Sequence, residues 1–325
     1  MRREFVLAGL VLTGALATAA GTIAQQAPAP GAPAQGQPAG QGRGGGRGGA
    51  AAAAPIGKIE KVADNLYMIP GQGGNSGVFI TANGVVLVDT KYATNGPAIL
   101  EQIKSVTDKP VSHVINTHTH GDHTGSNAEF PATVEIVTHE NTAANMAKGT
   151  NPDFNQPAMK HGLPDRSFKD RMTLLSGNDA IDLYYFGPAH TNGDALVVFR
   201  NARTMHSGDM FATKGNPNID RNNGGSGLEY GNTIQKAAAG IKNVERVITG
   251  HSTVMTWQDF VDYGEFNRLY LEHARASLKA GKTPEDAMKD FKLPEKFTGY
   301  ANLSGGRGGP AGNFTGLYED LKTAK

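Results

Sequence analysis

Short runs of apolar and β-branched residues, separated by turn residues, mark the chain from residue 58 to residue 89. The runs are followed by Asp-Asn, Gly-rich or Asn-Gly sequences, which is the pattern of β-strands joined by tight turns. The pattern predicts strands at 58–62, 66–69, 77–81 and 85–89. The Asn83-Gly84 pair between the last two predicts a β-hairpin.

The hydrophobic spacing changes after residue 94. Ile99, Ile103 and Val106 recur at helical intervals, which predicts a helix at 95–106. Strands and helices then alternate, and a helical pattern closes the sequence. The expected strands are 111–115, 134–138, 170–175, 180–186, 195–200, 203–206 and 244–248. The expected helices are 140–148, 229–242, 256–280 and 284–291.

Two long stretches, 149–168 and 213–227, have no regular pattern. The first is interrupted by prolines and the second is rich in Gly and Asn. Long loops inside a compact domain often carry function, so we expect these two to form walls of a site. The order of the predicted elements is a series of strands, a helix and then strand–helix units, given twice with variations. This order predicts an α/β fold in which helices sandwich the sheets.

The first 55 residues differ in composition from the rest. Residues 1–24 combine two arginines, an apolar run and small residues, as secretory signal peptides do. The pair Arg2-Arg3 resembles a twin-arginine signal, and an uncleaved membrane anchor is the alternative interpretation. Residues 25–55 are rich in Ala, Gly and Pro, which predicts a disordered linker. We therefore expect a periplasmic or secreted protein, with no stable membrane insertion after the signal is cleaved.

The remaining sequence divides into a domain at 56–255 and a helical extension at 256–325. The formal net charge of the 325 residues is +1, which gives no electrostatic footprint for nucleic acid. The chain has no cysteine, and this excludes thiolate metal ligands, disulfides and a Cys nucleophile. The charge therefore gives no reason to expect a nucleic-acid partner. The oligomeric state is left open.

The strongest chemical signal is the sequence Asn-Thr-His-Thr-His-Gly-Asp-His-Thr-Gly at 116–125. It places His118, His120, Asp122 and His123 within six residues, although the whole chain has only ten histidines. A strand should end before it, the chain should turn at Gly121, and a helix should start near Asp122. Such a loop between rigid elements can aim several imidazoles at one point, so the stretch predicts a metal site.

The stretch resembles the signature of the metallo-β-lactamase fold superfamily. Four other motifs of that family follow predicted strands in the expected order: Val86-Leu-Val-Asp89, Gly187-Pro-Ala-His190-Thr-Asn-Gly-Asp194, His206-Ser-Gly-Asp209 and Ile248-Thr-Gly-His251. The resemblance covers about residues 58–255. It implies that 56–255 is the catalytic domain, an αββα four-layer sandwich with a dinuclear site at one sheet edge.

The resemblance also implies a ligand set. One metal would be held by His118, His120 and His190, the other by Asp122, His123 and His251, with Asp209 as the bridge. Imidazole and carboxylate ligands suit two Zn²⁺ ions, with iron or manganese possible. Two such ions can share a hydroxide that attacks the substrate, and Asp122 would also orient the nucleophile or shuttle its proton. Asp89 is expected to orient a ligand or the loop, and the other histidines are expected to be structural.

Single positions distinguish the members of this superfamily. The lactamase subclasses with a Cys ligand are excluded, and the all-His subclass lacks an acid where this chain has Asp209. A bridging Asp is similar to glyoxalase II, lactonases and phosphodiesterases, although the export signal and the absence of a clear basic cluster depart from glyoxalase II. The expected function is an exported dinuclear zinc hydrolase that cleaves an ester, thioester or lactone-type bond, so the expected partner is a small-molecule substrate. The alternatives are a β-lactam hydrolase, a mononuclear iron enzyme like persulfide dioxygenase, and a non-catalytic binding module.

Overall fold

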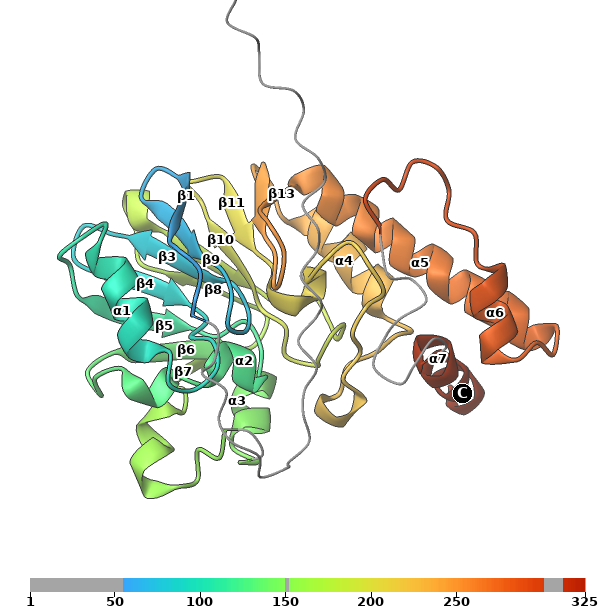
Figure 1. Ribbon diagram of the computed structural model, residues 1–325, viewed down its shortest axis with the longest axis horizontal. Helices are drawn as coiled ribbons and strands as arrows, with labels where there is room; N and C mark the ends of the chain where they lie inside the picture. Colours follow the sequence, from blue (N-terminus) through green and yellow to red (C-terminus); the bar gives the residue numbers. More distant parts are fainter. Residues whose placement is uncertain (1–54, 150–151, 301–311, 325) are drawn as a thin grey trace, which may run out of the picture. The chain divides into compact units, whose positions relative to one another are not determined.

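The computed structural model describes residues 55–149, 152–300 and 312–324 (Figure 1). The expected signal peptide at 1–24 and the expected linker at 25–55, apart from Pro55, lie outside the described residues. Within the described ranges, no helix is both long enough and apolar enough to cross a membrane.

The described residues form two β-sheets, one of seven strands and one of six. The first sheet contains, in spatial order, β1 (Glu60–Ala63), β2 (Leu66–Ile69), β3 (Ser76–Ile80), β4 (Val85–Val88), β5 (Val111–Ile115), β6 (Glu135–His139) and β7 (Arg166–Phe168). The second contains β13 (Met255–Thr256), β12 (Arg246–Ile248), β11 (Thr204–His206), β10 (Leu196–Phe199), β9 (Ile181–Tyr184) and β8 (Arg171–Leu174).

Strand direction decides which strand ends meet. In the first sheet β1 to β4 pair antiparallel, whereas β4, β5, β6 and β7 pair in parallel. The carboxyl ends of β4 and β5 therefore share one edge. In the second sheet β11 and β12 are parallel, and β10 is antiparallel to both β9 and β11. The carboxyl ends of β9, β11 and β12 therefore also share one edge.

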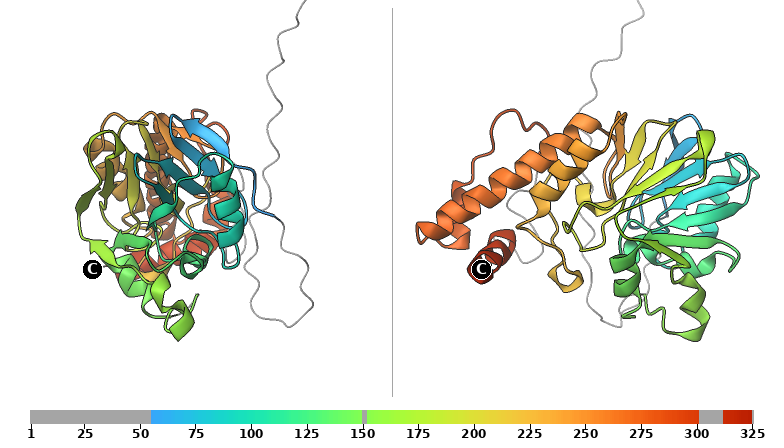
Figure 2. Two further views of the ribbon diagram at one scale, coloured as in Figure 1. Left: turned by 90° about the vertical axis from the view of Figure 1, so that its left-hand side faces the viewer. Right: turned by 180° about the vertical axis from the view of Figure 1, so that it is seen from behind.

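Helices cover the outer faces of both sheets (Figures 1 and 2). The helices are α1 (Gly96–Lys104), α2 (Gly121–Thr124), α3 (Glu140–Met146), α4 (Tyr230–Gly240), α5 (Trp257–Lys279), α6 (Pro284–Asp290) and α7 (Gly312–Thr323). Helix α1 packs on the first sheet, and α4 and α5 pack on the second. The expected αββα sandwich with a helical C-terminal region is confirmed.

The described residues form three apolar cores, and successive side chains of a central strand point into different ones. Val86 and Val88 of β4 lie in the core between the two sheets, together with Val197 and Phe199 of β10. The intervening residues of β4, Val85 and Leu87, face α1 instead. Those of β10, Leu196 and Val198, face α4 and α5. Both strands are apolar on both faces because each is covered on both sides.

One expectation about secondary structure is wrong. The stretch 149–168, expected to be irregular, contains a 3₁₀-helix at Pro157–Gly162 and strand β7. Arg166 and Ser167 of β7 are exposed, and only Phe168 is buried. Because the strand lies at a sheet edge and buries one side chain, it lacks the alternation that would predict a strand.

Candidate metal centre

The seven predicted ligands all lie just beyond the carboxyl ends of strands. His118 and His120 follow β5, and Asp122 and His123 lie on the single turn of α2. His190 lies between β9 and β10. Asp209 follows β11 on a 3₁₀ turn, and His251 follows β12. All seven side chains therefore lie in segments that follow strands, where the sequence motifs had predicted them.

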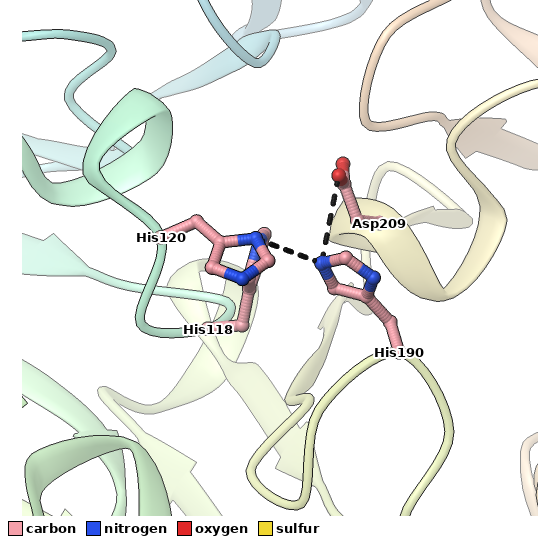
Figure 3. A group of neighbouring side chains, drawn as sticks. All are labelled: His118, His120, His190 and Asp209. Carbon is pink, nitrogen blue, oxygen red and sulfur yellow. Dashed lines mark hydrogen bonds and ion pairs between the residues drawn. The ribbon is translucent and has the colours of Figure 1, made fainter. Parts of the chain in front are cut away.

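The structure brings all seven side chains together in two groups. The first donor group consists of His118, His120, His190 and Asp209, and the second of Asp122, His123 and His251. Within each group the potential ligand atoms lie within 4.8 Å of one another. Figure 3 shows the four side chains of the first group converging from different segments of the chain.

Asp209 lies between the two groups. Its Oδ2 is 3.7 Å from His190 Nε2 in the first group. Its Oδ1 is 3.1 Å from His251 Nε2 and 3.3 Å from His123 Nε2 in the second. Burial opposes ionisation of this carboxyl, but His251 and His123 outweigh it and hold the pKa of Asp209 well below its usual range. Asp209 is thus a carboxylate that can reach both groups at once.

Neighbouring groups fix the tautomers of the first donor group. His190 Nδ1 lies 2.6 Å from the carbonyl oxygen of Asn218, and a carbonyl can only accept, so Nδ1 carries the proton. His120 Nε2 donates in the same way to Asp220 Oδ2 at 2.6 Å. Burial lowers the pKa of His190 to about 4, so its imidazole is neutral. These assignments follow from the hydrogen-bond network.

The third imidazole is fixed through a hydroxyl. Thr117 Oγ1 donates its only proton to Asp89 Oδ2 and therefore accepts from His118 Nδ1. Burial keeps the pKa of His118 well below its usual value, so this imidazole is also neutral. Its Nε2 is then a bare acceptor, and this buried atom has no hydrogen-bond partner within the described residues.

The first donor group therefore presents lone pairs to one point. His120 Nδ1 and His190 Nε2 lie 3.0 Å apart, and the other nitrogen of each ring is held by an oxygen acceptor. The buried His118 Nε2 has no hydrogen-bond partner within the described residues, which is costly. A divalent cation would relieve that cost, and three imidazoles with a carboxylate are a fitting donor set for it.

The second donor group is richer in negative charge. His123 Nδ1 lies 2.7 Å from Asp89 Oδ2, and its Nε2 faces Asp209, His251 and Asp122. Burial alone would lower the pKa values of both imidazoles. Asp209 and Asp122 outweigh it, raising the pKa of His251 to about 9 and that of His123 well above its usual value. Without a cation these carboxylates hold protons on the imidazoles, and a divalent cation would take the place of those protons.

Asp89 connects the two groups. Its Oδ1 accepts from the backbone N–H of Thr117 at 2.8 Å, and its Oδ2 accepts from the Thr117 hydroxyl and from His123 Nδ1, both at 2.7 Å. One fully buried carboxylate thus orients His123 directly and His118 through Thr117. This is the orienting position expected for it.

The Gly-rich stretch at 71–77 is firmly anchored. The ammonium of Lys91 donates to the carbonyl oxygens of Ile69, Gly71 and Gly74 at 2.7–2.8 Å. The backbone N–H of Gly74 donates to Asp122 O, and a Cβ at Gly74 would lie 2.1 Å from His123 Cε1. The turn therefore packs directly on the second donor group.

The other histidines have partners outside the two donor groups. His113 pairs with Glu135, and the remaining four bind backbone carbonyls: His139 that of Lys169, His161 that of Ala128, His206 that of Asn75 and His273 that of Ala287. These contacts are structural, as the sequence analysis expected.

Sequence reasoning missed the supports of the first donor group, Asp220 and the Asn218 carbonyl. The hydrogen bond from His120 and those from Asn223 hold the pKa of Asp220 far below its usual range, against burial. The only available signal was that Asp220 lies in the long loop at 213–227, which was expected to be functional. Nothing in its neighbourhood marks this Asp as a partner of His120, one hundred residues away.

The centre is partly exposed. His118 and His190 are buried, whereas the side chains of His120, Asp122 and His251 are 18%, 19% and 31% exposed. These three side chains are therefore the donors that a small molecule can contact from solvent.

Comparison with known proteins identifies the family. Residues 69–251, more than half of the chain, match the metallo-beta-lactamase superfamily. The chain belongs to this superfamily, as its motifs predicted, and is an enzyme of the metal-dependent hydrolase type. With the histidine and aspartate groups described above, membership implies a divalent metal.

Two curated relatives illustrate the range of the family. The type 2 metallo-beta-lactamase of Elizabethkingia meningoseptica is 26% identical over 216 residues, which are 62% of this chain and 80% of that protein. The 2,4-dinitroanisole O-demethylase subunit alpha of Nocardioides sp. (strain JS1661) is 31% identical over 142 residues, which are 42% of this chain. The match spans only 40% of the demethylase subunit.

Solved structures show the same fold. A metallo-beta-lactamase from Pontibacter korlensis has a TM-score of 0.56 at 18% identity and covers 66% of this chain and 99% of its own. A double mutant of the sec-alkyl sulfatase PisA1 has a TM-score of 0.67 at 14% identity, covering 82% of this chain and 50% of its own. At these identities the likeness concerns the fold alone.

Proposed function

We propose that the protein is an exported dinuclear zinc hydrolase that cleaves a carboxylic ester, thioester or lactone. The observation that carries this proposal is the position of Asp209. Its two oxygens face different donor groups, so one carboxylate can serve two ions. Export rests on the signal-like sequence of residues 1–24 alone.

The donor atoms favour zinc. Five imidazole nitrogens and two aspartates suit Zn²⁺, and they also permit iron or manganese. When bound, a pair of divalent ions supplies a water nucleophile at neutral pH and polarises the bond to be cleaved. His118, His120 and His190 would hold one ion, and Asp122, His123 and His251 the other, with Asp209 between them.

Asp122 is the residue best placed to handle a proton. Its carboxyl is partly exposed and lies 3.3 Å from His251 Nε2. Burial opposes ionisation, but His123 and His251 lower the pKa of Asp122 to about 2, so it is a carboxylate at neutral pH. Such a group can ligate through one oxygen and orient or accept a proton from an attacking water with the other.

β-Lactam hydrolysis is the second candidate. It is supported by the type 2 metallo-beta-lactamase, which matches this chain over 80% of its own length. Asp209 favours the ester-type reaction instead, because a bridging carboxylate resembles the general hydrolases of the superfamily. The partial match to a 2,4-dinitroanisole O-demethylase subunit makes an aryl methyl ether a third substrate to test.

The test combines metal analysis of the purified full chain with a substrate panel. The panel holds a thioester, a lactone, an aryl ester, a chromogenic cephalosporin, an aryl phosphodiester and 2,4-dinitroanisole. We expect two zinc ions per chain and the fastest turnover on one of the first three substrates. One ion per chain would refute the dinuclear centre. Preference for the cephalosporin would replace the ester proposal with the lactamase one.

Two matched histidine variants test the site itself. His120→Ala should abolish turnover while the fold is retained, because it removes a donor from the first group. His113→Ala removes a histidine that pairs with Glu135 outside the centre and should leave turnover intact. Full activity of His120→Ala would refute the assignment.

One iron per chain with oxygen consumption on a persulfide would instead support the dioxygenase alternative.

A further inference from the structure

The loop at 213–227 supports two of the three histidines in the first donor group. Asp220 Oδ2 accepts from His120 Nε2 at 2.6 Å, and the carbonyl of Asn218 accepts from His190 Nδ1 at 2.6 Å. The Asp220 carboxylate is itself held, because its Oδ2 accepts from Asn223 Nδ2 at 2.6 Å. The inner side of this loop therefore determines the tautomers of both histidines.

The outer side of the same loop is held by helix α7, at the end of the chain. Arg221 forms a bidentate ion pair with Asp320, with Nε–Oδ1 and Nη2–Oδ2 distances of 2.9 and 2.7 Å. Asn313 Nδ2 donates to the carbonyl oxygen of Pro217 at 2.9 Å. Both Asn313 and Asp320 lie on α7.

Inner and outer contacts alternate along the loop. Pro217 and Arg221, which contact α7, are immediate neighbours of Asn218 and Asp220, which contact the histidines. A shift of the outer contact would therefore move the inner one by way of a single peptide unit. The bidentate geometry of an arginine–carboxylate pair restricts such shifts more than a single hydrogen bond would.

Helix α7 is anchored independently of these polar contacts. Phe314 is fully buried, and its ring lies 4.4 Å from that of Tyr270 on α5, centroid to centroid. Leu317 and Tyr318 are also buried in the same apolar core. The ion pair to the loop can thus be removed while α7 stays in place, which makes its effect testable.

We propose that Asp220 is a positioning residue for metal ligand His120 and that α7 sets its position through Arg221 and Asp320. The inference rests on the proposed function, because it concerns the same metal centre. A carboxylate that accepts a hydrogen bond from the N–H of a ligating histidine fixes its tautomer and makes the ligating nitrogen more basic. Helix α7 of the C-terminal extension then contributes to the metal affinity of the centre.

The test measures zinc affinity by competition with a chelator of known affinity, on the full chain. Asp220→Asn should weaken binding about 10–100-fold, as removal of a ligand's partner commonly does. Asp320→Asn should weaken it less, on the order of 2–5-fold, because it removes one ion pair at a distance. Asp290→Asn is the matched control, since it breaks the pair between Lys282 and Asp290, the last residue of α6, and should leave affinity unchanged.

A double variant separates positioning from general destabilisation. If α7 acts through Asp220, then Asp220→Asn combined with Asp320→Asn should bind zinc no more weakly than Asp220→Asn alone. The absorption spectrum of the Co²⁺-substituted protein should change in Asp220→Asn and Asp320→Asn but not in Asp290→Asn. Wild-type affinity and spectrum in Asp320→Asn, or losses that multiply in the double variant, would overturn the proposal.

The outcomes are distinguishable from those for the proposed function. Zinc affinity is measured without any substrate, so the hydrolase proposal can fail on the substrate panel while the positioning role stands. Conversely, if the protein is a zinc-dependent esterase and Asp320→Asn leaves its zinc affinity unchanged, the proposed function stands and the role of α7 is refuted. A thermal melt of each variant checks that it is folded when the affinity is measured.

Discussion

Asp89→Asn should remove the carboxylate that orients histidines of both donor groups. In the wild type, Asp89 accepts three hydrogen bonds at 2.7–2.8 Å, from the Thr117 backbone, the Thr117 hydroxyl and His123 Nδ1. An asparagine of the same shape has only one acceptor oxygen, and its amide must donate. With the amide facing His123, Nδ1 must become an acceptor, so the neutral ring carries its one proton on Nε2, the atom that faces the second donor group.

The size of the effect follows from these contacts. Asp89 is fully buried, and two hydrogen bonds to its charged oxygen are lost or reversed. Each bond to a buried charge contributes about 1.5–3 kcal/mol, so the metal-free protein should lose about 3–6 kcal/mol of its free energy of unfolding. Zinc affinity of the second group should fall about 10–100-fold, because the neutral His123 ring would no longer present a lone pair at Nε2.

Urea unfolding of the metal-free protein and zinc competition measure the two effects separately. Asp182→Asn is the control for affinity, because Asp182 lies on β9 and pairs with Arg171 and Arg200, away from the donor groups. It should leave zinc affinity unchanged. If Asp89→Asn binds zinc as tightly as the wild type, then Asp89 does not determine the His123 tautomer, and the reasoning is refuted.

Three further predictions follow from buried or paired charges. Lys91→Met leaves three carbonyl oxygens without their ammonium donor. At about 1–3 kcal/mol for each carbonyl, the free energy of unfolding should fall by about 3 kcal/mol or more. An unchanged urea midpoint would contradict this. Burial raises the pKa of Asp182, but hydrogen bonds from Arg200, Thr173 and Arg171 outweigh burial and lower this pKa from 3.8 to about 2. The stabilisation of the folded protein by ionised Asp182 is therefore complete above about pH 4 and is lost as the pH falls toward 2. Urea midpoints of Asp182→Asn should lack this acid-dependent loss. Zinc added to the metal-free protein at about pH 8 should release protons from His123 and His251, and an indicator dye that detects no release would exclude their raised pKa values.

The positions of the candidate ligands were predictable because each of their segments follows a strand with buried residues. Ile115 and Ile248 are fully buried, and His118 and His251 each come three residues later. A buried strand gives a clear apolar run, and a polar residue just after it must lie at the sheet edge. Histidine is also rare enough in this chain for a cluster to carry information.

The supports of these ligands could not be predicted in the same way. Asp220 lies in a Gly- and Asn-rich loop with no periodicity, and its partner His120 is one hundred residues earlier. The pairing depends on the path of the loop, which in turn depends on Arg221 and on a helix beyond residue 311. Contacts between two irregular or distant segments leave no local pattern in a sequence.

The centre also joins the two sheets of the sandwich. His118 and His123 follow strands of the first sheet, whereas His190, Asp209 and His251 follow strands of the second. Ile115 and Ile248, the last residues of β5 and β12, pack in the core between the sheets, so apolar packing sets the separation from which the donor atoms start. A bound ion would then link the two layers, and because it binds only the folded arrangement, its binding free energy would add to stability. The same link explains why loss of one orienting carboxylate, Asp89, should affect both metal affinity and folding.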